Sequence, residues 1–84
     1  MVDPLSIAVG VRLRGIREAK GLSQDELAAR AGIHRTFVGR VERGETNITM
    51  KTLYKIASGL GILMPELLPS EFGKRAKVKT KKGG

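Results

Sequence analysis

Residues 24–43, QDELAARAGIHRTFVGRVER, decide the fold of this chain, because they read as two short helices joined by a tight turn. The first helix is predicted to begin after Ser23, whose hydroxyl can accept a hydrogen bond from an early helical N–H. Glu26 completes an S-x-x-E capping box with it. Gly32 follows where a chain that reverses sharply needs a residue tolerant of positive φ. The second helix is predicted to run from about His34 to Arg43.

The small and apolar residues of this stretch have the spacing of a helix-turn-helix motif. Leu27, Ala28 and Ala31 share one face of the first helix, and Val38 and Val41 form the inner stripe of the second. Ala28 falls where the two helices cross, so a larger side chain would push them apart. The plainer interpretation is an ordinary helical hairpin with a solvated basic face. The combination of this spacing with the capping box favours the motif.

The outer face of the second helix carries polar or small residues, which can enter a DNA major groove. These residues are His34, Arg35, Thr36, Gly39, Arg40 and Arg43. An arginine that reaches a guanine edge donates two hydrogen bonds, to O6 and N7, and a threonine can offer its methyl group to thymine. The alternative for each of these side chains is a contact with phosphate or with solvent alone.

Two helix starts in this motif are also candidate phosphate sites, because N–H groups and the helix dipole favour an anion there. Ser23 and Gln24 lie at the first start, although capping alone would also explain Ser23. His34 begins the second helix as a phosphate neighbour or partial cap. Arg43 can reach a phosphate, or can interact with the carbonyls at the end of its own helix.

Further helices are predicted on both sides of the motif. One spans about Pro4 to Lys20, with Asp3 as its N-cap and an inner face formed by Leu5, Val9, Leu13 and Ile16. Another spans about Met50 to Gly59, where Gly59 and Gly61 are expected to break it, with Leu53, Ile56, Ala57 and Leu60 on its inner face. A last turn or two is expected over residues 65–68.

The predicted fold class is therefore all-α: a compact five-helix domain over residues 1–72, with the motif at 24–43. Residues 73–84 are expected to form a disordered, lysine-rich tail. The formal net charge is +8, and six of the sixteen cations lie in residues 74–84, where there is no anion. This asymmetry favours an anionic polymer as partner, and a membrane surface less.

Composition excludes several classes of site. The chain has 84 residues, no cysteine and one histidine, so neither disulfides nor a zinc site are expected, and no metal or cofactor is predicted. No apolar run approaches the ~20 residues that span a bilayer. The N-terminus has no basic segment typical of a signal peptide. A cytoplasmic protein with no membrane partner is expected.

The sequence resembles the phage-repressor-like, or XRE-type, helix-turn-helix family. The resemblance rests on IREAKGLSQDELAARAGIHRTFVGRVERGE at 16–45 and on LYKIASGLGI at 53–62, followed by ELL. Within that family it is most similar to the small controller proteins of restriction–modification systems, through HRTFVGRVERG and then TNIT. Many repressors and antitoxins share this scaffold.

The resemblance implies a lambda-repressor-like domain that binds double-stranded operator DNA as a symmetric homodimer on an inverted repeat. It gives base-reading positions to Arg35, Thr36 and Arg40, and backbone-contacting positions to Gln24, His34 and Asn47. It also implies a buried ion pair between Arg17 and Glu42, which ties the first helix to the recognition helix. Gly39 departs from the pattern, because it offers no side chain at a base-facing position. The lysine tail is not a standard family feature.

Four apolar residues are candidates for the dimer interface. The family core needs Ile62, so Leu63 is an apolar excess. With Met50, Tyr54 and Met64 it can form a self-complementary patch between two copies. The alternative is a single exposed leucine, which is ordinary.

The leading prediction is thus a homodimeric, sequence-specific transcriptional regulator. An antitoxin that neutralises a toxin and also autoregulates its promoter is the alternative, with the tail as the arm to suspect. Binding to RNA, or to any nucleic acid through charge alone, has little support, because one tyrosine and two phenylalanines leave few side chains for base stacking. An enzyme is not expected, since no paired carboxylates, phosphate-binding glycine loop or metal cluster is present in the sequence.

Overall fold

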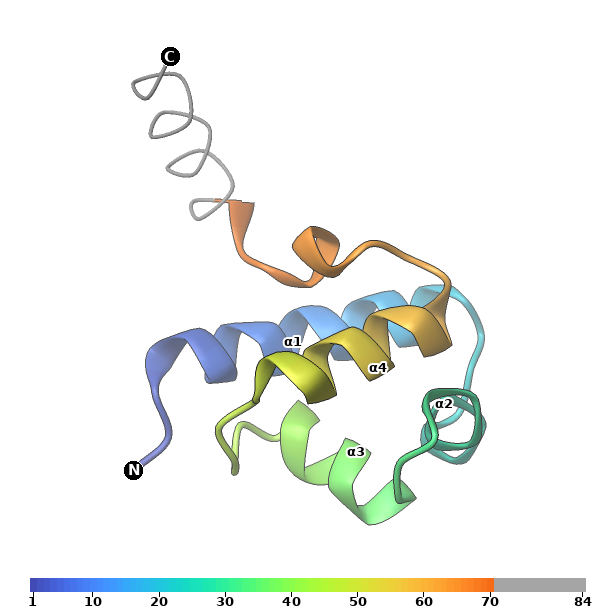
Figure 1. The fold of residues 1–84 in the computed structure, drawn as a ribbon, viewed down its shortest axis with the longest axis horizontal. Coiled ribbons are helices and arrows are strands. Elements are labelled where there is room, and N and C mark those ends of the chain that lie inside the picture. Colours follow the sequence, from blue (N-terminus) through green and yellow to red (C-terminus); the bar gives the residue numbers. More distant parts are fainter. Residues whose placement is uncertain (71–84) are drawn as a thin grey trace.

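The fold is all-α over residues 1–70, the part of the chain that this computed structural model describes (Figure 1). Its elements are α1 (Pro4–Ala19), α2 (Gln24–Ala31), α3 (Arg35–Glu42), α4 (Met50–Leu60) and the 3-10 turn η1 (Met64–Leu67). The predicted fold class is confirmed. The predicted domain end at residue 72 and the predicted disordered tail over residues 73–84 lie outside the described residues.

The expected fifth helix is only the single 3-10 turn η1. Leu68 has extended backbone angles, φ −91° and ψ 149°, and it precedes Pro69. A proline disfavours the helical conformation of the residue before it, so the chain leaves the turn at that point. At the other end of the turn, the Leu63 N–H donates to the Glu66 carboxylate at 2.9 Å. The five-helix prediction is therefore corrected to four α-helices and one 3-10 turn among the described residues.

Side chains close the N-terminal end of every α-helix of the described residues. The cap residues are Asp3, Ser23, His34 and Thr49, and each accepts a hydrogen bond from a backbone N–H in the first turn. Three predicted boundaries, one in α1 and two in α3, shift by one residue. Lys20 is the C-cap of α1, and α3 is shorter than the predicted 34–43 because His34 and Arg43 are its caps.

Two helical glycines are present because another element approaches closely. A Cβ atom on Gly10 would overlap the carbonyl oxygen of Val41 at the end of α3. A Cβ on Gly59 would lie 3.0 Å from the backbone nitrogen of Ala31 in α2. The prediction that Gly59 breaks α4 is wrong: the helix continues to Leu60, and Gly61 ends it with a φ of 72°.

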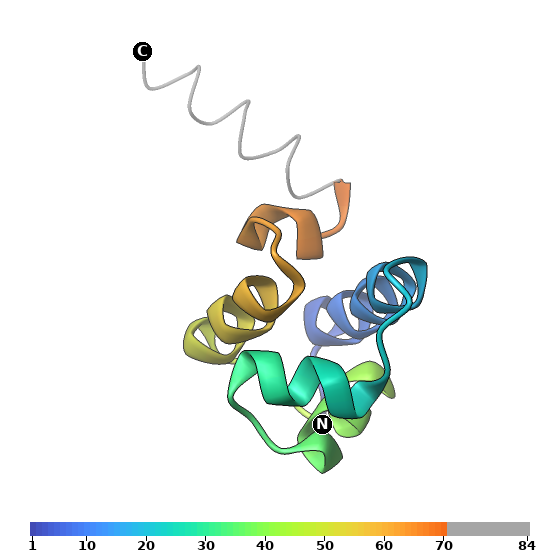
Figure 2. The same ribbon diagram turned by 90° about the vertical axis from the view of Figure 1, so that its right-hand side faces the viewer.

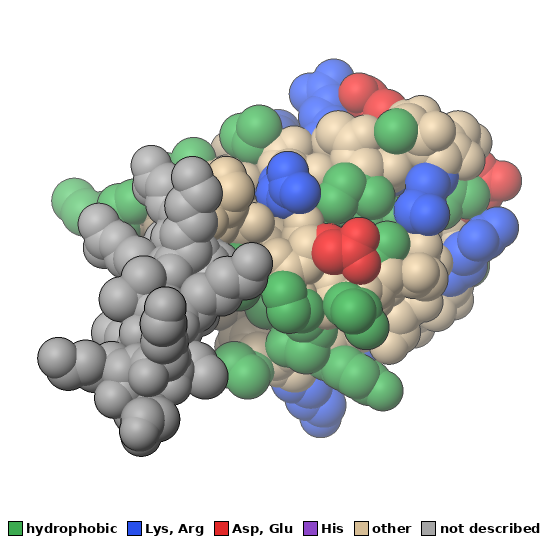
Figure 3. All heavy atoms as spheres, turned by 90° about the horizontal axis from the view of Figure 1, so that it is seen from above, with side chains coloured by type: hydrophobic (Ala, Val, Ile, Leu, Met, Phe, Trp, Pro, Cys, Tyr) green, Lys and Arg blue, Asp and Glu red, His purple; other side chains and the backbone are tan. Residues whose placement is uncertain are grey.

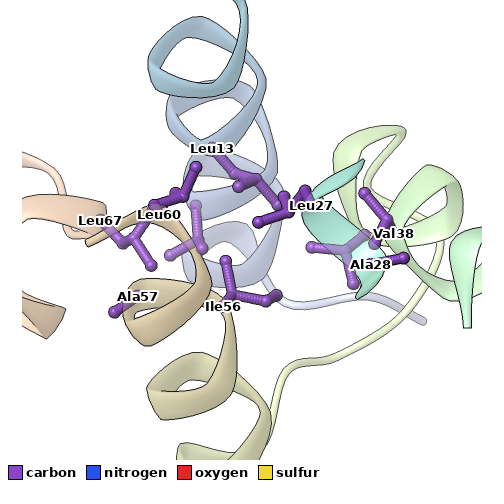
Figure 4. Packing of buried hydrophobic residues seen from close by; sticks show 10 residues of the cluster. Leu13, Leu27, Ala28, Val38, Ile56, Ala57, Leu60 and Leu67 are labelled. Atoms are coloured by element: carbon purple, nitrogen blue, oxygen red, sulfur yellow. The ribbon is translucent and has the colours of Figure 1, made fainter. Parts of the chain in front are cut away.

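The four helices surround one core. α2 packs against α3 and α4, and α1 packs against α3. In two perpendicular views, α2 and α3 lie on one side of α1 and α4, and η1 lies on the other side (Figures 1 and 2). The core draws residues from all five elements (Figure 4); its members are Val9, Leu13, Leu27, Ala28, Val38, Val41, Ile56, Ala57, Leu60 and Leu67. This packing holds α3 at the surface with its polar face outward.

No helix within residues 1–70 is both long enough and apolar enough to cross a membrane.

Candidate nucleic-acid interface

The candidate interface begins at the capping box that starts α2. The Ser23 hydroxyl accepts a hydrogen bond from the Glu26 N–H at 3.0 Å, and the Glu26 carboxylate accepts one from the Ser23 N–H at 2.8 Å. The backbone N–H of Ser23, and then its hydroxyl, lower the pKa of Glu26, because both favour the charged carboxylate. The box fixes where the helix starts and so presents Gln24 at its first turn.

A buried polar cluster joins three helices beneath this start. Arg17 of α1 donates to Glu42 of α3 through Nε at 2.6 Å and through Nη2 at 3.0 Å. Arg17 Nη1 also donates to the Leu22 carbonyl at 2.7 Å, and Gln24 Nε2 donates to Glu42 Oε1 at 2.9 Å. The hydrogen bonds to Glu42 raise the pKa of Arg17, against the opposing effect of burial. Gln24 thereby connects α2 to the end of α3.

The turn between α2 and α3 orients the second helix. Gly32 has a φ of 70°, in the left-handed region, and its N–H donates to the Ala28 carbonyl. His34 Nδ1 then accepts a hydrogen bond from the Thr36 N–H at 3.1 Å. Because Nδ1 is the acceptor, the neutral ring carries its proton on Nε2. His34 is therefore a cap that keeps one N–H free for an anion.

An open hollow of about 460 Å³ lies between the start of α2 and the outer face of α3. It brings together most of the predicted DNA-contacting residues; its lining consists of Arg17, Ser23, Gln24, Asp25, Arg35, Thr36, Gly39 and Arg43. Arg35 is exposed and its Nη1 lies 3.5 Å from Oδ1 of Asp25. A carboxylate of α2 thus lies beside one predicted base-reading arginine of α3.

A second arginine of this hollow is hydrogen-bonded to a carboxylate of the loop after α3. Arg43 donates to Glu45 through Nε at 3.0 Å and through Nη2 at 3.1 Å. These hydrogen bonds raise the pKa of Arg43 and lower the pKa of Glu45. Nη1 of Arg43 lies 3.0 Å from the point that a Cβ on Gly39 would occupy. The guanidinium therefore lies over Gly39.

The remaining predicted contact residues lie outside the lining of the hollow. His34 and Arg40 are exposed at the start and on the outer part of α3. Asn47 is engaged with the N-terminus of the chain: its Oδ1 accepts a hydrogen bond from the Asp3 N–H at 2.8 Å. Neither Asp25 nor Glu45 was expected at this site from the sequence, since neither is basic or directly on α3.

The predicted dimer residues are apolar and mostly exposed. The exposed fraction is 75% for Met50, 61% for Tyr54 and 71% for Leu63, whereas the core side chains are buried. Tyr54, Leu63 and half-buried Met64 line a common apolar hollow beside Ala57, whereas Met50 lines a different one, with Leu5 and Leu53. Hydrophobic side chains gather on the face that carries η1, seen from above (Figure 3). The structure thus groups three of the four residues.

No group of three or more His, Asp or Glu side chains within residues 1–70 is arranged to hold a metal ion.

Comparison with known proteins decides the family. The sequence pattern of the family described as Helix-turn-helix matches residues 13–67, which include α2, α3 and the turn between them. The chain belongs to the helix-turn-helix family. This membership confirms the resemblance that the motif at residues 24–43 carries. It is a family of DNA-binding transcription regulators.

Among members of the helix-turn-helix family, restriction–modification controllers are close relatives of this chain. Control protein C.SmaI of Serratia marcescens is 45% identical over 56 residues, which cover 67% of each protein. The crystal structure of controller protein C.AhdI from Aeromonas hydrophila is 45% identical, with a TM-score of 0.72, and covers 74% of this chain and 94% of that one. Controller protein C.Esp1396I, solved as a tetramer on its natural 35 base-pair operator, is 33% identical, with a TM-score of 0.70 over 73% of this chain and 80% of that one.

Proposed function

We propose that this chain is a sequence-specific transcriptional regulator that binds an inverted-repeat operator as a homodimer, in the manner of a restriction–modification controller. The observation that carries the proposal is the hollow between α2 and α3, where a helix start, a glutamine and two arginines converge on one exposed face. A helix start favours an anion through its N–H groups and dipole, and arginines are the side chains that bind guanine edges and phosphates. The similarity to a controller protein solved on its operator supports the same interpretation.

Recognition of sequence is assigned to α3, residues 35–42, lying in the major groove. Arg35 and Arg40 are the proposed readers of guanine, and Thr36 is the proposed reader of thymine. Arg35 lines the hollow, and its exposed guanidinium lies 3.5 Å from the Asp25 carboxylate. Such an exposed pair is weak, so the guanidinium can exchange Asp25 for a guanine edge.

Contacts with the DNA backbone are assigned to the helix starts and to the loop after α3. The proposed residues are Ser23, Gln24, His34 and Asn47. Gln24 is the best placed of them, because its amide is fixed by Glu42 at the start of α2. His34 has a ring N–H available for a phosphate oxygen while its other nitrogen caps α3. Asn47 can contact a phosphate only when the hydrogen bond that its Oδ1 accepts from the Asp3 N–H is replaced by a contact with DNA.

Dimerisation is assigned to the apolar patch formed by Tyr54, Leu63 and Met64, while Met50, which lines a separate hollow, is a second candidate for the interface. A two-fold axis through this patch would bring it against the same patch of a second copy. A closed dimer requires such a self-complementary contact. The two α3 helices would then meet successive major grooves about one DNA turn apart.

The proposal includes no enzymatic activity. The one buried carboxylate of the site, Glu42, accepts three hydrogen bonds from Arg17 and Gln24, so its role is structural. Action on operator DNA implies a cytoplasmic location.

Footprinting of the DNA upstream of the gene for this chain tests the proposal. Purified protein is expected to protect an inverted repeat whose half-site centres lie about 10 base pairs apart. The Leu63→Glu variant is expected to lose this protection at the same protein concentration. Uniform protection, with no preferred segment for either protein, would contradict the proposal.

A further inference from the structure

Gly39 occupies a position of α3 that faces the proposed groove, and it offers no side chain of its own. Residues 35, 39 and 43 are four apart, so they lie on one face of α3 and its C-terminal cap. The gap at Gly39 is nevertheless filled. Nη1 of Arg43 lies 3.0 Å from the point where a Cβ on Gly39 would be, and Gly39 is buried as a result.

The route of the Arg43 side chain follows from helix geometry. Long side chains in this geometry point back toward the helix N-terminus and cover the residue four positions earlier. A Cβ at position 39 would push the guanidinium away by a few tenths of an ångström, and a longer side chain would compete for the same space. The glycine therefore makes room for Arg43 in the hollow that Arg35, Thr36 and Gln24 also line.

Glu45 fixes which edge of the guanidinium stays available. It accepts hydrogen bonds from Nε and Nη2, so one side of the planar group is occupied. At the end formed by Nη1 and Nη2, each nitrogen keeps an N–H that Glu45 does not use, and two parallel donors of this kind match O6 and N7 of guanine. The carboxylate also restricts the rotamers of an arginine whose side chain is 56% exposed.

We infer that Arg43, lying over Gly39 and oriented by Glu45, reads a guanine in each half-site, in addition to the bases read by Arg35 and its neighbours. This inference rests on the proposed function. It departs from the sequence-based expectation that Arg43 contacts a phosphate or its own helix end. The base position that Gly39 leaves unread becomes the position that Arg43 reads.

The test is a selection of bound duplexes from a random pool with wild type and three variants in parallel. Arg43→Lys keeps the charge and loses the two-pronged donor. Gly39→Ala keeps Arg43 and shifts its guanidinium by a few tenths of an ångström, at no cost to the helix, since the only contact closer than 3.4 Å is with the end of a flexible side chain. Arg14→Lys is the matched control, because Arg14 pairs with Glu18 at 3.1 Å on α1, away from the hollow, with similar exposure.

Wild type and Arg14→Lys are expected to enrich the same inverted repeat. Arg43→Lys is expected to lose one guanine preference per half-site, by roughly 5- to 150-fold, and to keep the others. Gly39→Ala is expected to weaken the same preference by a smaller factor. Variants that enrich the wild-type repeat with every base preference intact would overturn the inference and leave the proposed function standing. If wild type enriches no sequence at all, the proposed function itself fails, and the inference fails with it.

Discussion

Arg17 and Glu42 join α1 to the end of α3 through two hydrogen bonds of 2.6 and 3.0 Å, and both side chains are almost completely buried. Gln24 adds a third hydrogen bond to the same carboxylate from α2. One acidic side chain therefore fixes the positions of three helices relative to each other. The exposed face of α3 depends on this contact, although neither partner of the pair needs to touch DNA.

Removal of Glu42 is expected to destabilise the fold strongly. Glu42→Ala leaves the Arg17 guanidinium buried without its partner, at a cost of roughly 3–5 kcal/mol in the free energy of unfolding. The double variant Arg17→Met with Glu42→Leu is expected to recover most of that loss, because no buried charge remains. Urea unfolding followed by circular dichroism measures both.

Glu45→Ala is the control for this prediction. It removes an exposed carboxylate 3.0 Å from Arg43, and such surface pairs contribute about 0–1 kcal/mol. A loss for Glu42→Ala no larger than the loss for Glu45→Ala would contradict the role of the buried pair.

The two glycines of α1 are expected to respond in opposite directions to alanine. Gly10→Ala places a Cβ against the Val41 carbonyl, which is backbone and cannot move aside, so a loss of about 1–3 kcal/mol is expected. At Gly15 a Cβ would meet nothing within 4 Å, so Gly15→Ala is expected to stabilise the helix by about 0.5–1 kcal/mol. Thermal unfolding of both variants checks this. Equal shifts in Tm would show that α1 does not approach α3 as described.

The capping box makes stability depend on pH. The pKa of Glu26 is lowered in the folded chain by the Ser23 N–H and hydroxyl. The stabilisation by ionised Glu26 is therefore fully present above the ordinary carboxyl pKa of 4.5. It is lost as the pH falls through the lowered pKa of the folded chain. Unfolding free energies of wild type and Glu26→Gln, measured from pH 7 down to pH 3, are expected to converge toward the acid end. Parallel curves would rule out a contribution from Glu26 ionisation.

The apolar patch is expected to control the oligomeric state. Leu63→Glu places a charge where two copies would meet and is expected to raise the dimer dissociation constant more than about tenfold. Val11→Glu is the matched control, since Val11 is 68% exposed on α1 and Leu63 is 71% exposed. Sedimentation equilibrium measures both. Dimers of equal strength in the two variants would place the interface elsewhere.

The local parts of the fold could be predicted from the sequence. Ser23 with Glu26, Gly32 and the stripe of Val38 and Val41 are short-range signals, and the structure forms the cap, the turn and the buried face that they indicate. The error at Gly59 has a long-range cause. Glycine weakens an isolated helix, and only the close approach of Ala31 explains why it lies within α4.

The electrostatic details of the site could not be predicted for a similar reason. Asp25 is ten positions from Arg35 along the chain, and only the turn between α2 and α3 brings them to 3.5 Å. The placement of Arg43 over Gly39 depends on the rotamer that Glu45 holds. Spacing along one helix identifies which residues share a face, but not which of them a neighbouring carboxylate orients.

Competition binding at about 0.15 M salt tests the central claim most directly, with the protected repeat and a shuffled duplex of the same composition as ligands. Wild type is expected to prefer the repeat by at least about 10³-fold, and Arg14→Ala is expected to match it. Arg35→Ala is expected to lose about 5- to 150-fold of that preference for each half-site, which is the contribution of one bidentate guanine contact, and the homodimer loses two such contacts. Equal affinity of the wild-type protein for the two duplexes would contradict the account, because binding would then come from charge alone.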